Sequence, residues 1–265
     1  TLTSIANDDQ DGSYIVDWSD VSGATSYRLQ EDDNLDFTTP TSRYTGSASQ
    51  YTLNSQAGGT WYYRVKAANA GGDSDWSNVR STMVKPEAPT LSSIVSYGRD
   101  YTVEWSAVAG ATGYTLQEDT TPTFANPETF DTGTTAKDFI DRVGGTYYYR
   151  VKASNGAGDS AWSNTGSITI KPTTPTLSPI PNGDGNGAYT ISWAAVTGAA
   201  DYVLQQDRSA AFADPTERYR GPTTSLAVSN QPGGAWYYRV KASNTAGDSG
   251  WSRVVSTTVK PASPT

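Results

Sequence analysis

The sequence predicts an all-β protein of three tandem seven-stranded antiparallel sandwiches arranged as an elongated rod. A unit of about 90 residues recurs three times, which is typical of one folded module repeated in tandem. Its clearest echo is Trp61–Ser77, which returns as Tyr147–Ser163 and Trp236–Ser252. Within each copy, apolar residues alternate with polar ones over short segments separated by turn residues, and no helical period is found.

The predicted strands follow in the same order in every copy, and the second copy illustrates them. Residues 101–105 alternate apolar with polar side chains, as expected of a strand with one buried face, and residues 114–116 do the same. The longer segment 147–153 places two Tyr, a Val and an Ala on one face, with Gly- and Asn-rich turns on either side. Residues 167–171 supply the last strand.

The repeat also predicts the module boundaries, at residues 1–86, 87–172 and 173–265. Each joint carries two prolines within five residues, so the connectors are expected to be short and stiff rather than flexible. Thr1 stands at the same repeat position as the Thr residues that open the later copies. Either a cloning boundary chosen at a linker or a window cut from a longer array explains this coincidence.

Composition excludes several classes of function. The 265 residues include no His and no Cys, which removes the commonest general base, the commonest metal ligand and all thiolate chemistry. The net charge of −8 disfavours nucleic acid, because neutralising phosphates requires a basic patch. No apolar run reaches the length of a membrane span. We therefore expect neither an enzyme nor a nucleic-acid-binding protein.

Two sets of aromatic residues recur with the repeat. The Trp that ends the first alternating strand is predicted to be the buried centre of each core: Trp18, Trp105 and Trp193. The Trp after the long strand is predicted to stack with outward-facing cations of that strand in a stiffening cation–π ladder, and a sugar-stacking platform is the alternative. The predicted ladders are Trp76 with Arg64 and Lys66, Trp162 with Arg150 and Lys152, and Trp251 with Arg239 and Lys241.

Two loops carry the residues of a weak calcium candidate. Asp8, Asp9 and Asp11 alternate with turn residues in the first copy, and Asp184 and Asn186 do so in the third. Hard cations favour several oxygens presented by a tight turn. No bidentate Glu follows at the required distance and the second copy is shorter there, so ordinary turn chemistry is the preferred interpretation and no cofactor is expected.

Acidic residues follow the next predicted strand, as Glu31-Asp32-Asp33 and Glu118-Asp119. Paired carboxylates can hydrolyse glycosides, but the third copy has Gln206 in place of the Glu. We interpret these runs as solvated loops and predict no catalytic residue.

The middle of the second copy is harder to place. Matching Leu53 and Val228 to Ile140 leaves Phe139 out of phase with the buried face. An exposed Phe here would be a contact point, and a bulge that returns it to the core is the simpler interpretation.

These features resemble the fibronectin type III module. The resemblance rests on a Pro-rich start, a Trp in the second strand, Tyr-x-Leu in the third and aromatic-x-x-Arg-Val-x-Ala-x-Asn-x-x-Gly in the sixth, over nearly the whole chain. The Tyr-x-Leu-Gln-Glu-Asp run with a later Phe and Pro is similar to type III modules of secreted or cell-surface bacterial proteins. The resemblance implies an immunoglobulin-like sandwich and an extracellular or cell-surface location without catalysis.

The expected function is that of a non-catalytic structural array, either a rigid spacer or the body of an extracellular fibre. The alternative is an adhesion or carbohydrate- or protein-binding accessory module. Neighbouring copies of the same module or other extracellular proteins are the expected partners, and a polysaccharide is the alternative.

Overall fold

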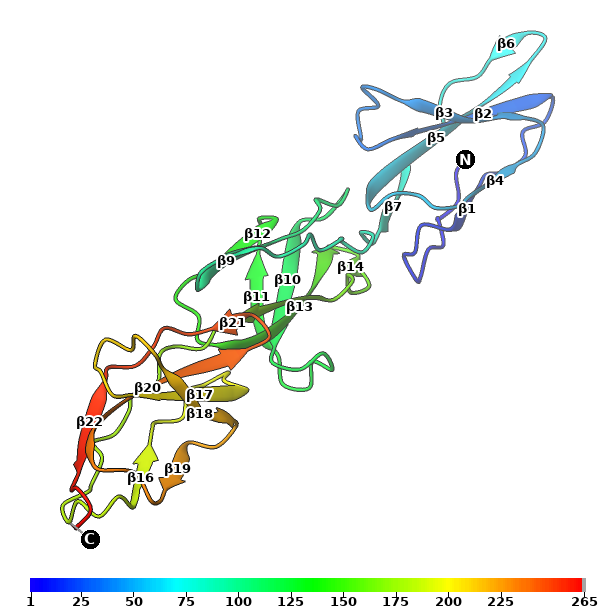
Figure 1. The fold of residues 1–265 in the computed structure, drawn as a ribbon. Coiled ribbons are helices and arrows are strands. Elements are labelled where there is room, and N and C mark those ends of the chain that lie inside the picture. Colours follow the sequence, from blue (N-terminus) through cyan, green and yellow to red (C-terminus); the bar gives the residue numbers. More distant parts are fainter. Residues whose placement is uncertain (264–265) are drawn as a thin grey trace.

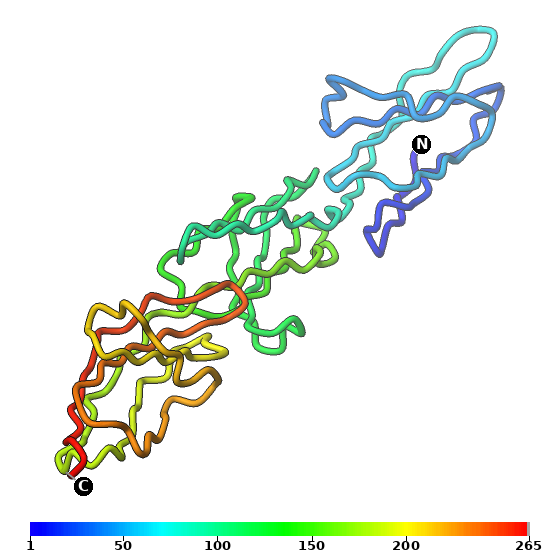
Figure 2. Tube along the Cα trace, viewed as in Figure 1, coloured from blue at the N-terminus to red at the C-terminus, as the bar shows by residue number. Residues whose placement is uncertain are grey.

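The computed structural model describes residues 1–263 and confirms an all-β chain of three antiparallel sandwiches. The sandwiches follow one another along a single line, with the N-terminus in the first and the C-terminus at the far end of the third (Figure 1). The chain trace passes once from each module to the next without returning (Figure 2). The first and third modules therefore lie at opposite ends of an elongated molecule.

Each sandwich pairs a small sheet with a larger one. In the first module β1 pairs with β4, and the chain start joins them through a bridge between Leu2 and Trp18. The larger sheet has the order β3-β2-β5, with β6 and β7 both pairing β5. The strands are β1 (Tyr14–Asp17), β2 (Ser26–Asp32), β3 (Thr41–Gly46), β4 (Gln50–Leu53), β5 (Gly59–Asn69), β6 (Gly72–Asp73) and β7 (Arg80–Val84).

The second and third modules repeat this plan. The second adds a short hairpin of β8 and β9 at the edge of its small sheet. Its strands are β8 (Ser96–Tyr97), β9 (Asp100–Glu104), β10 (Gly113–Asp119), β11 (Glu128–Thr132), β12 (Ala136–Phe139), β13 (Gly145–Asn155), β14 (Gly158–Asp159) and β15 (Gly166–Ile170). Those of the third are β16 (Tyr189–Ser192), β17 (Asp201–Asp207), β18 (Thr216–Gly221), β19 (Ser225–Val228), β20 (Gly234–Asn244), β21 (Gly247–Asp248) and β22 (Val255–Val259).

The long central strand supplies one wall of each core. On β5, Tyr63, Val65 and Ala67 point inward at every second position, as the period of a strand requires. The hydroxyl of Tyr63 is 2.7 Å from that of Tyr14 on β1, so a hydrogen bond joins the two sheets across the core. The same pair recurs between Tyr101 and Tyr149 at 2.6 Å, and between Tyr189 and Tyr238 at 2.7 Å.

The Trp at the end of each small-sheet strand lies deep inside its module. Trp18, Trp105 and Trp193 are each 4% exposed, and Trp18 packs against the ring of Tyr27 with centroids 5.7 Å apart. Their indole N–H groups are buried without a hydrogen-bond partner among residues 1–263. Packing of these rings against their neighbours therefore supplies the stabilisation, because burying an N–H group without a hydrogen bond is unfavourable.

Phe139 belongs to the core of the second module, but the expected register, which required a bulge to bury it, is wrong. It is 5% exposed and pairs with Tyr101, as Leu53 pairs with Tyr14 in the first module. Ile140, which was matched to Leu53, is instead 74% exposed. No bulge is involved, since the register of β12 against β9 is continuous. The error is a shift of one residue, and in a strand one residue exchanges the two faces.

This register yields a direct test of the core. We expect Phe139→Ala to destabilise the second module by about 3–5 kcal/mol, because it removes a buried ring that stacks on Tyr101. The neighbouring Ile140→Ala should change stability by less than about 0.5 kcal/mol. Hydrogen exchange of the β9 and β12 amides measures both effects module by module. Equal effects of the two substitutions would contradict the register.

Candidate functional site

The first module carries a ladder of cations and aromatic rings on the outer face of its larger sheet. Arg64 on β5 has its guanidinium carbon 4.1 Å from the ring centroid of Phe37 and 4.4 Å from that of Trp76. Lys66, two residues along the strand, lies 4.9 Å from the Trp76 ring and pairs with Asp73. The ladder thus ties the loop before β3 and the segment after β6 onto the central strand.

Hydrogen bonds hold the ladder cation in place. The guanidinium of Arg64 donates from Nε and one terminal nitrogen to Oε1 of Gln30 on the adjacent strand β2, at 3.0 and 2.8 Å. The other ladders keep this geometry at nearly equal distances. Arg150 lies 4.3 Å from Phe124 and 4.4 Å from Trp162, Arg239 lies 4.2 Å from Phe212 and 4.4 Å from Trp251, and Lys152 and Lys241 lie 5.2 and 4.9 Å from those Trp rings.

Sequence reasoning missed the Phe in each ladder. Phe37, Phe124 and Phe212 are each 7% exposed, although they lie in loops outside the alternating strands. All three also have a positive φ near +50°, which is uncommon for a bulky residue and marks a tightly defined loop. The available signal was their recurrence at one repeat position. Periodicity within strands could not reveal it.

An acidic residue holds the loop that contains Phe37. The expectation of a solvated loop is wrong for Asp32, whereas Asp33 is exposed. Asp32 closes strand β2 and is 3% exposed. Its carboxylate accepts hydrogen bonds from the backbone amides of Asn34 and Thr39, at 3.1 and 2.9 Å. In this way a single carboxylate fixes both arms of the loop that places Phe37 against Arg64.

The neighbouring Glu31 points into the core instead. It is 1% exposed and accepts from the hydroxyl of Tyr63 at 2.5 Å and from Nε of Arg43 at 2.9 Å. Gln56 Nε2 donates to the same carboxylate at 3.2 Å. A buried carboxylate is costly unless it is paired and hydrogen-bonded, and here both conditions are met. Glu31 therefore continues the buried positions of Tyr27 and Leu29 on the inward face of β2.

In the other modules, different partners satisfy the buried side chain at the position equivalent to Glu31. Glu118 accepts from Tyr149 at 2.6 Å and pairs with Arg142, which comes from the loop after β12 rather than from the edge strand. In the third module the equivalent position is Gln206, which accepts from Tyr238 at 3.3 Å and from Gln231 Nε2 at 3.3 Å. A neutral amide thus replaces the charged pair in the same buried position. This favours a structural rather than a catalytic role for the acidic residues.

The protonation of these groups follows from their surroundings. For Asp32, burial raises the pKa, but the amides of Thr39 and Asn34 outweigh it and the net pKa is below the usual range. The amides of Asn126 and Ser209 likewise lower the pKa of Asp119 and of Asp207. Burial raises the pKa of Tyr14 to about 12, so its hydroxyl stays protonated at ordinary pH.

The calcium candidates lie in turns and bond to their own backbone. Asp11 Oδ1 accepts from the amide of Ser13 at 2.8 Å, and Asp9 Oδ1 accepts from the amide of Asp11 at 3.4 Å. In the third module Asp184 and Asn186 each accept from the amide two residues later, at 3.2 and 2.9 Å. Over residues 1–263 no three Asp, Glu, His or Cys side chains gather closely enough to hold a metal ion. Asp8, the remaining candidate, is exposed.

The first and second modules meet backbone to backbone. A methyl group on Gly110 would lie 2.0 Å from the carbonyl oxygen of Gly58, so no side chain fits at this contact. Gly110 also has a φ of +70°, a conformation that favours glycine. Asn155 Nδ2 donates to the carbonyl oxygens of Val84 at 2.8 Å and of Gly110 at 3.1 Å, which ties the end of the first module to the second.

The second joint repeats the first with equivalent residues. A methyl group on Gly198, whose φ is +74°, would lie 2.2 Å from the carbonyl oxygen of Gly144. Asn244 Nδ2 donates to the carbonyl oxygens of Ile170 at 2.8 Å and of Gly198 at 3.0 Å. The two joints therefore share the same Gly and Asn contacts, and a Lys-Pro pair follows the last strand at both.

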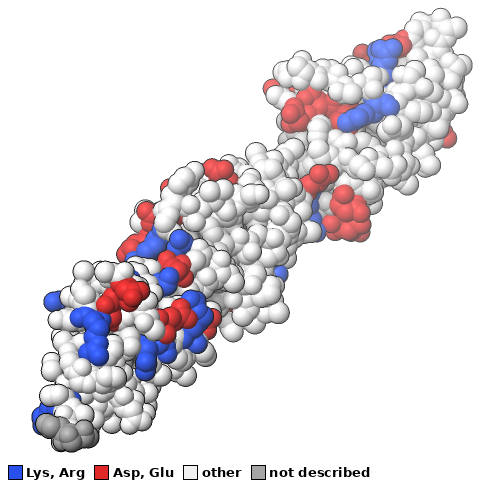
Figure 3. Space-filling view, in the orientation of Figure 1, with Lys and Arg blue, Asp and Glu red and all other residues white. Residues whose placement is uncertain are grey.

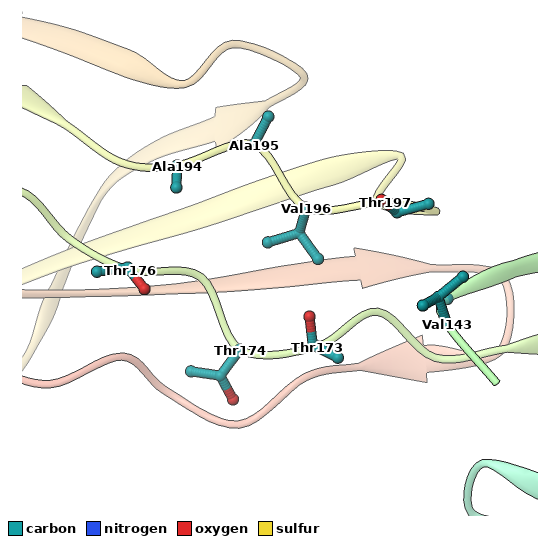
Figure 4. Close-up of a pocket in the computed structure, with 9 residues that line it drawn as sticks. Val143, Thr173, Thr174, Thr176, Ala194, Ala195, Val196 and Thr197 are labelled. Carbon is teal, nitrogen blue, oxygen red and sulfur yellow. The ribbon is translucent and has the colours of Figure 1, made fainter. Parts of the chain in front are cut away.

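A cavity of about 260 Å³ lies beside the second joint. The linker runs along it, with Val143 of the second module and the segment 194–197 of the third nearby (Figure 4). Small and apolar or hydroxyl side chains line it, and none of them is an acid or a base at ordinary pH. The lining residues are Val143, Gly144, Thr173, Thr174, Thr176, Ala194, Ala195, Val196 and Thr197.

On the face shown in Figure 3, Lys and Arg side chains lie among Asp and Glu rather than in one basic patch. Residues 1–263 contain no helix that is long and apolar enough to cross a membrane.

Neither a family model nor a curated protein matches the chain. Among solved structures it is similar to the crystal structure of the FN1–FN3 domains of chicken CNTN1, at 18% sequence identity and a TM-score of 0.41. That match covers 98% of this chain and 97% of the other.

The ladder should contribute measurably to the stability of its module. We expect Arg64→Met, which keeps the apolar stem but removes the charge, to destabilise the first module by about 1–3 kcal/mol, because it loses two ring contacts and the bonds to Gln30. Hydrogen exchange of the β5 amides provides the measurement. Arg28→Met, on the exposed face of β2, is the control. A loss no larger than that of the control would exclude a stabilising ladder.

The lowered pKa of Asp207 predicts that the stability of the third module depends on pH. The folded third module holds this proton more weakly than the unfolded chain, so its stabilisation is present above about pH 4 and is lost as pH falls through the folded pKa. Asp207→Asn should lower the urea midpoint at pH 7 and shrink the difference between pH 7 and acid. Urea titrations across this range test it. Asp214→Asn, with an exposed side chain, is the control and should change the urea midpoint at pH 7 less than Asp207→Asn does.

Proposed function

We propose that the chain is a non-catalytic structural array that holds three modules at a fixed spacing, as a rigid spacer or as the body of a fibre. The proposed modules are residues 1–86, 87–172 and 173–265. The observation that carries this proposal is the joint, which occurs twice with the same backbone contact and the same Asn bridge. A device built twice in one chain supports a function that depends on the relative placement of modules.

The geometry of the joint explains why it resists bending. The Gly58–Gly110 contact brings the modules together at one point, and Asn155 bonds both sides at a second. Tilting one module would break the bridge, at about 1 kcal/mol per hydrogen bond, or force the backbones into each other. Pro86 and Pro89 further restrict the linker itself. A flexible tether would instead carry a Gly/Ser-rich linker.

The ladders support the structural role over the alternative of a carbohydrate- or protein-binding accessory module. Trp76, Trp162 and Trp251 are partly buried, and each has a face occupied by an Arg and a Lys of its own module. A sugar needs an open aromatic face for stacking. The cations thus use the surface that a sugar would require.

We place the array in a secreted or cell-surface protein, and the resemblance to type III modules of bacterial proteins supports that location. Its partners would be neighbouring copies of the same module or other extracellular proteins. The mixed surface charge favours neither nucleic acid nor an anionic membrane surface.

The test is the spread of distances between two modules. Because the chain has no Cys, Thr52→Cys and Thr129→Cys at exposed strand positions place spin labels in the first and second modules alone. Pulsed electron resonance should give one narrow distance distribution. Insertion of four Gly/Ser residues between Lys85 and Pro86 should broaden it, since the linker then adds freedom.

The matched control inserts the same residues after Gly133, in an open turn within the second module. It should leave the distribution narrow. A broad distribution in the unmodified chain, or one that the linker insertion does not change, would overturn the rigid array.

A further inference from the structure

The receiving half of each joint consists of three residues on the N-terminal end of the following module. In the second module these are Gly110 in the turn, Asn155 at the end of the long strand and Gly158 in the hairpin, and in the third they are Gly198, Asn244 and Gly247. Both hairpin glycines lie against a Lys of the preceding module. A methyl group placed on Gly158 would lie 3.0 Å from Cε of Lys85, and one on Gly247 would lie 3.0 Å from Cε of Lys171. We call this set the receiving face.

The first module carries the same receiving face. Gly23 has a φ of +79°, beside +70° and +74° for Gly110 and Gly198, and Gly72 has a φ of +120°. Asn69 Nδ2 donates to the carbonyl oxygen of Gly23 at 2.9 Å, as its equivalents do within their own modules. The conformation of the joint is therefore built here as well.

The receiving face of the first module differs from the other two in that no preceding module lies against it in the structure. A methyl group on Gly23 or Gly72 would have no atom of residues 1–263 within 4 Å, whereas one on Gly110 or Gly198 would overlap the preceding module. Among residues 1–263, Asn69 Nδ2 also has no counterpart to the bonds that Asn155 and Asn244 make with a last-strand carbonyl. The face is formed and open.

We propose that this face of the first module receives the C-terminal end of another module of this same type, joined in front of it through the same contact. The incoming module must offer a Gly-Gly turn, a free last-strand carbonyl and a Lys-Pro linker. The proposal extends the proposed array by one joint and rests on the geometry of the internal joints. A general protein ligand is disfavoured, because all three residues match a contact that two modules of this chain already make.

The end of the second module is the better choice of incoming partner for an experiment. In the third module, Arg208 donates to the carbonyl oxygen of Gly233 at 3.1 Å and lies 2.5 Å from a methyl group placed on Gly234. It thus covers the turn that would enter a joint. The second module has Thr120 at this position.

The experiment uses a four-module chain in which a copy of residues 90–175 is joined directly before Thr1, which preserves the linker spacing. Spin labels at Ser42→Cys of the first module and Asp138→Cys of the added copy report on the new joint. They occupy positions equivalent to Thr129 and Thr52, which report on the first internal joint. We expect distributions of equal width at the two joints.

Gly23→Asn supplies the decisive variant, since Asn tolerates positive φ while its side chain would overlap an incoming turn. In the four-module chain it should about double the width at the new joint, to that of a flexible linker, and leave the internal joint unchanged. In the original chain it should leave the circular dichroism and thermal midpoint unchanged. Gly110→Asn is the positive control at the internal joint.

Two outcomes would overturn the proposal: a broad distribution at the new joint beside a narrow internal one, or no effect of Gly23→Asn. In both cases the proposed rigid array still stands. Broad distributions at both joints would instead contradict the proposed function.

Discussion

The form of the molecule depends on a contact between two backbones with no side chain between them. At Gly58–Gly110 and Gly144–Gly198 the chains approach so closely that even a methyl group is excluded. Such an approach sets distance and tilt together, because neither side can shift without overlap or loss of contact. The Asn bridge then sets the remaining rotation by bonding to one carbonyl on each side. Order along the rod follows from this local arrangement.

The interior of each module can be understood as the support for that joint. The receiving Asn closes the long strand, which also carries the ladder cations on one face and the core tyrosine on the other. The buried Glu31 or Glu118 reaches the same tyrosine, and Gln206 replaces it in the third module. A buried ion pair and a neutral amide are therefore interchangeable here, as expected where attraction between charges only offsets their loss of water.

The fold could be predicted from the sequence, because a triple repeat and period-two alternation are local signals that tertiary contacts reinforce. The sequence was not sufficient where one residue of register decides the face, as at Phe139 and Ile140. The prediction from sequence also failed at Glu31 and Asp32, because their charge suggested exposure to solvent. Glu31 is instead buried against Tyr63, a partner distant in the sequence, and Asp32 is buried by the amides of the loop that follows it. The contacts at the joints could not be predicted, because their glycines are also typical of ordinary turns and only the structure shows the neighbouring module beside them.

Within residues 1–263, no ion pair spans a joint, and this bears on the solution conditions under which the proposed array would keep its shape. The salt bridges found among the described residues all join groups of one module, while amide, carbonyl and glycine contacts span the modules. Dissolved salt screens charges but hardly affects neutral hydrogen bonds or steric contact. In the proposed array, the relative placement of neighbouring modules should therefore depend little on ionic strength. The array would then keep the same length in dilute and in concentrated salt solutions.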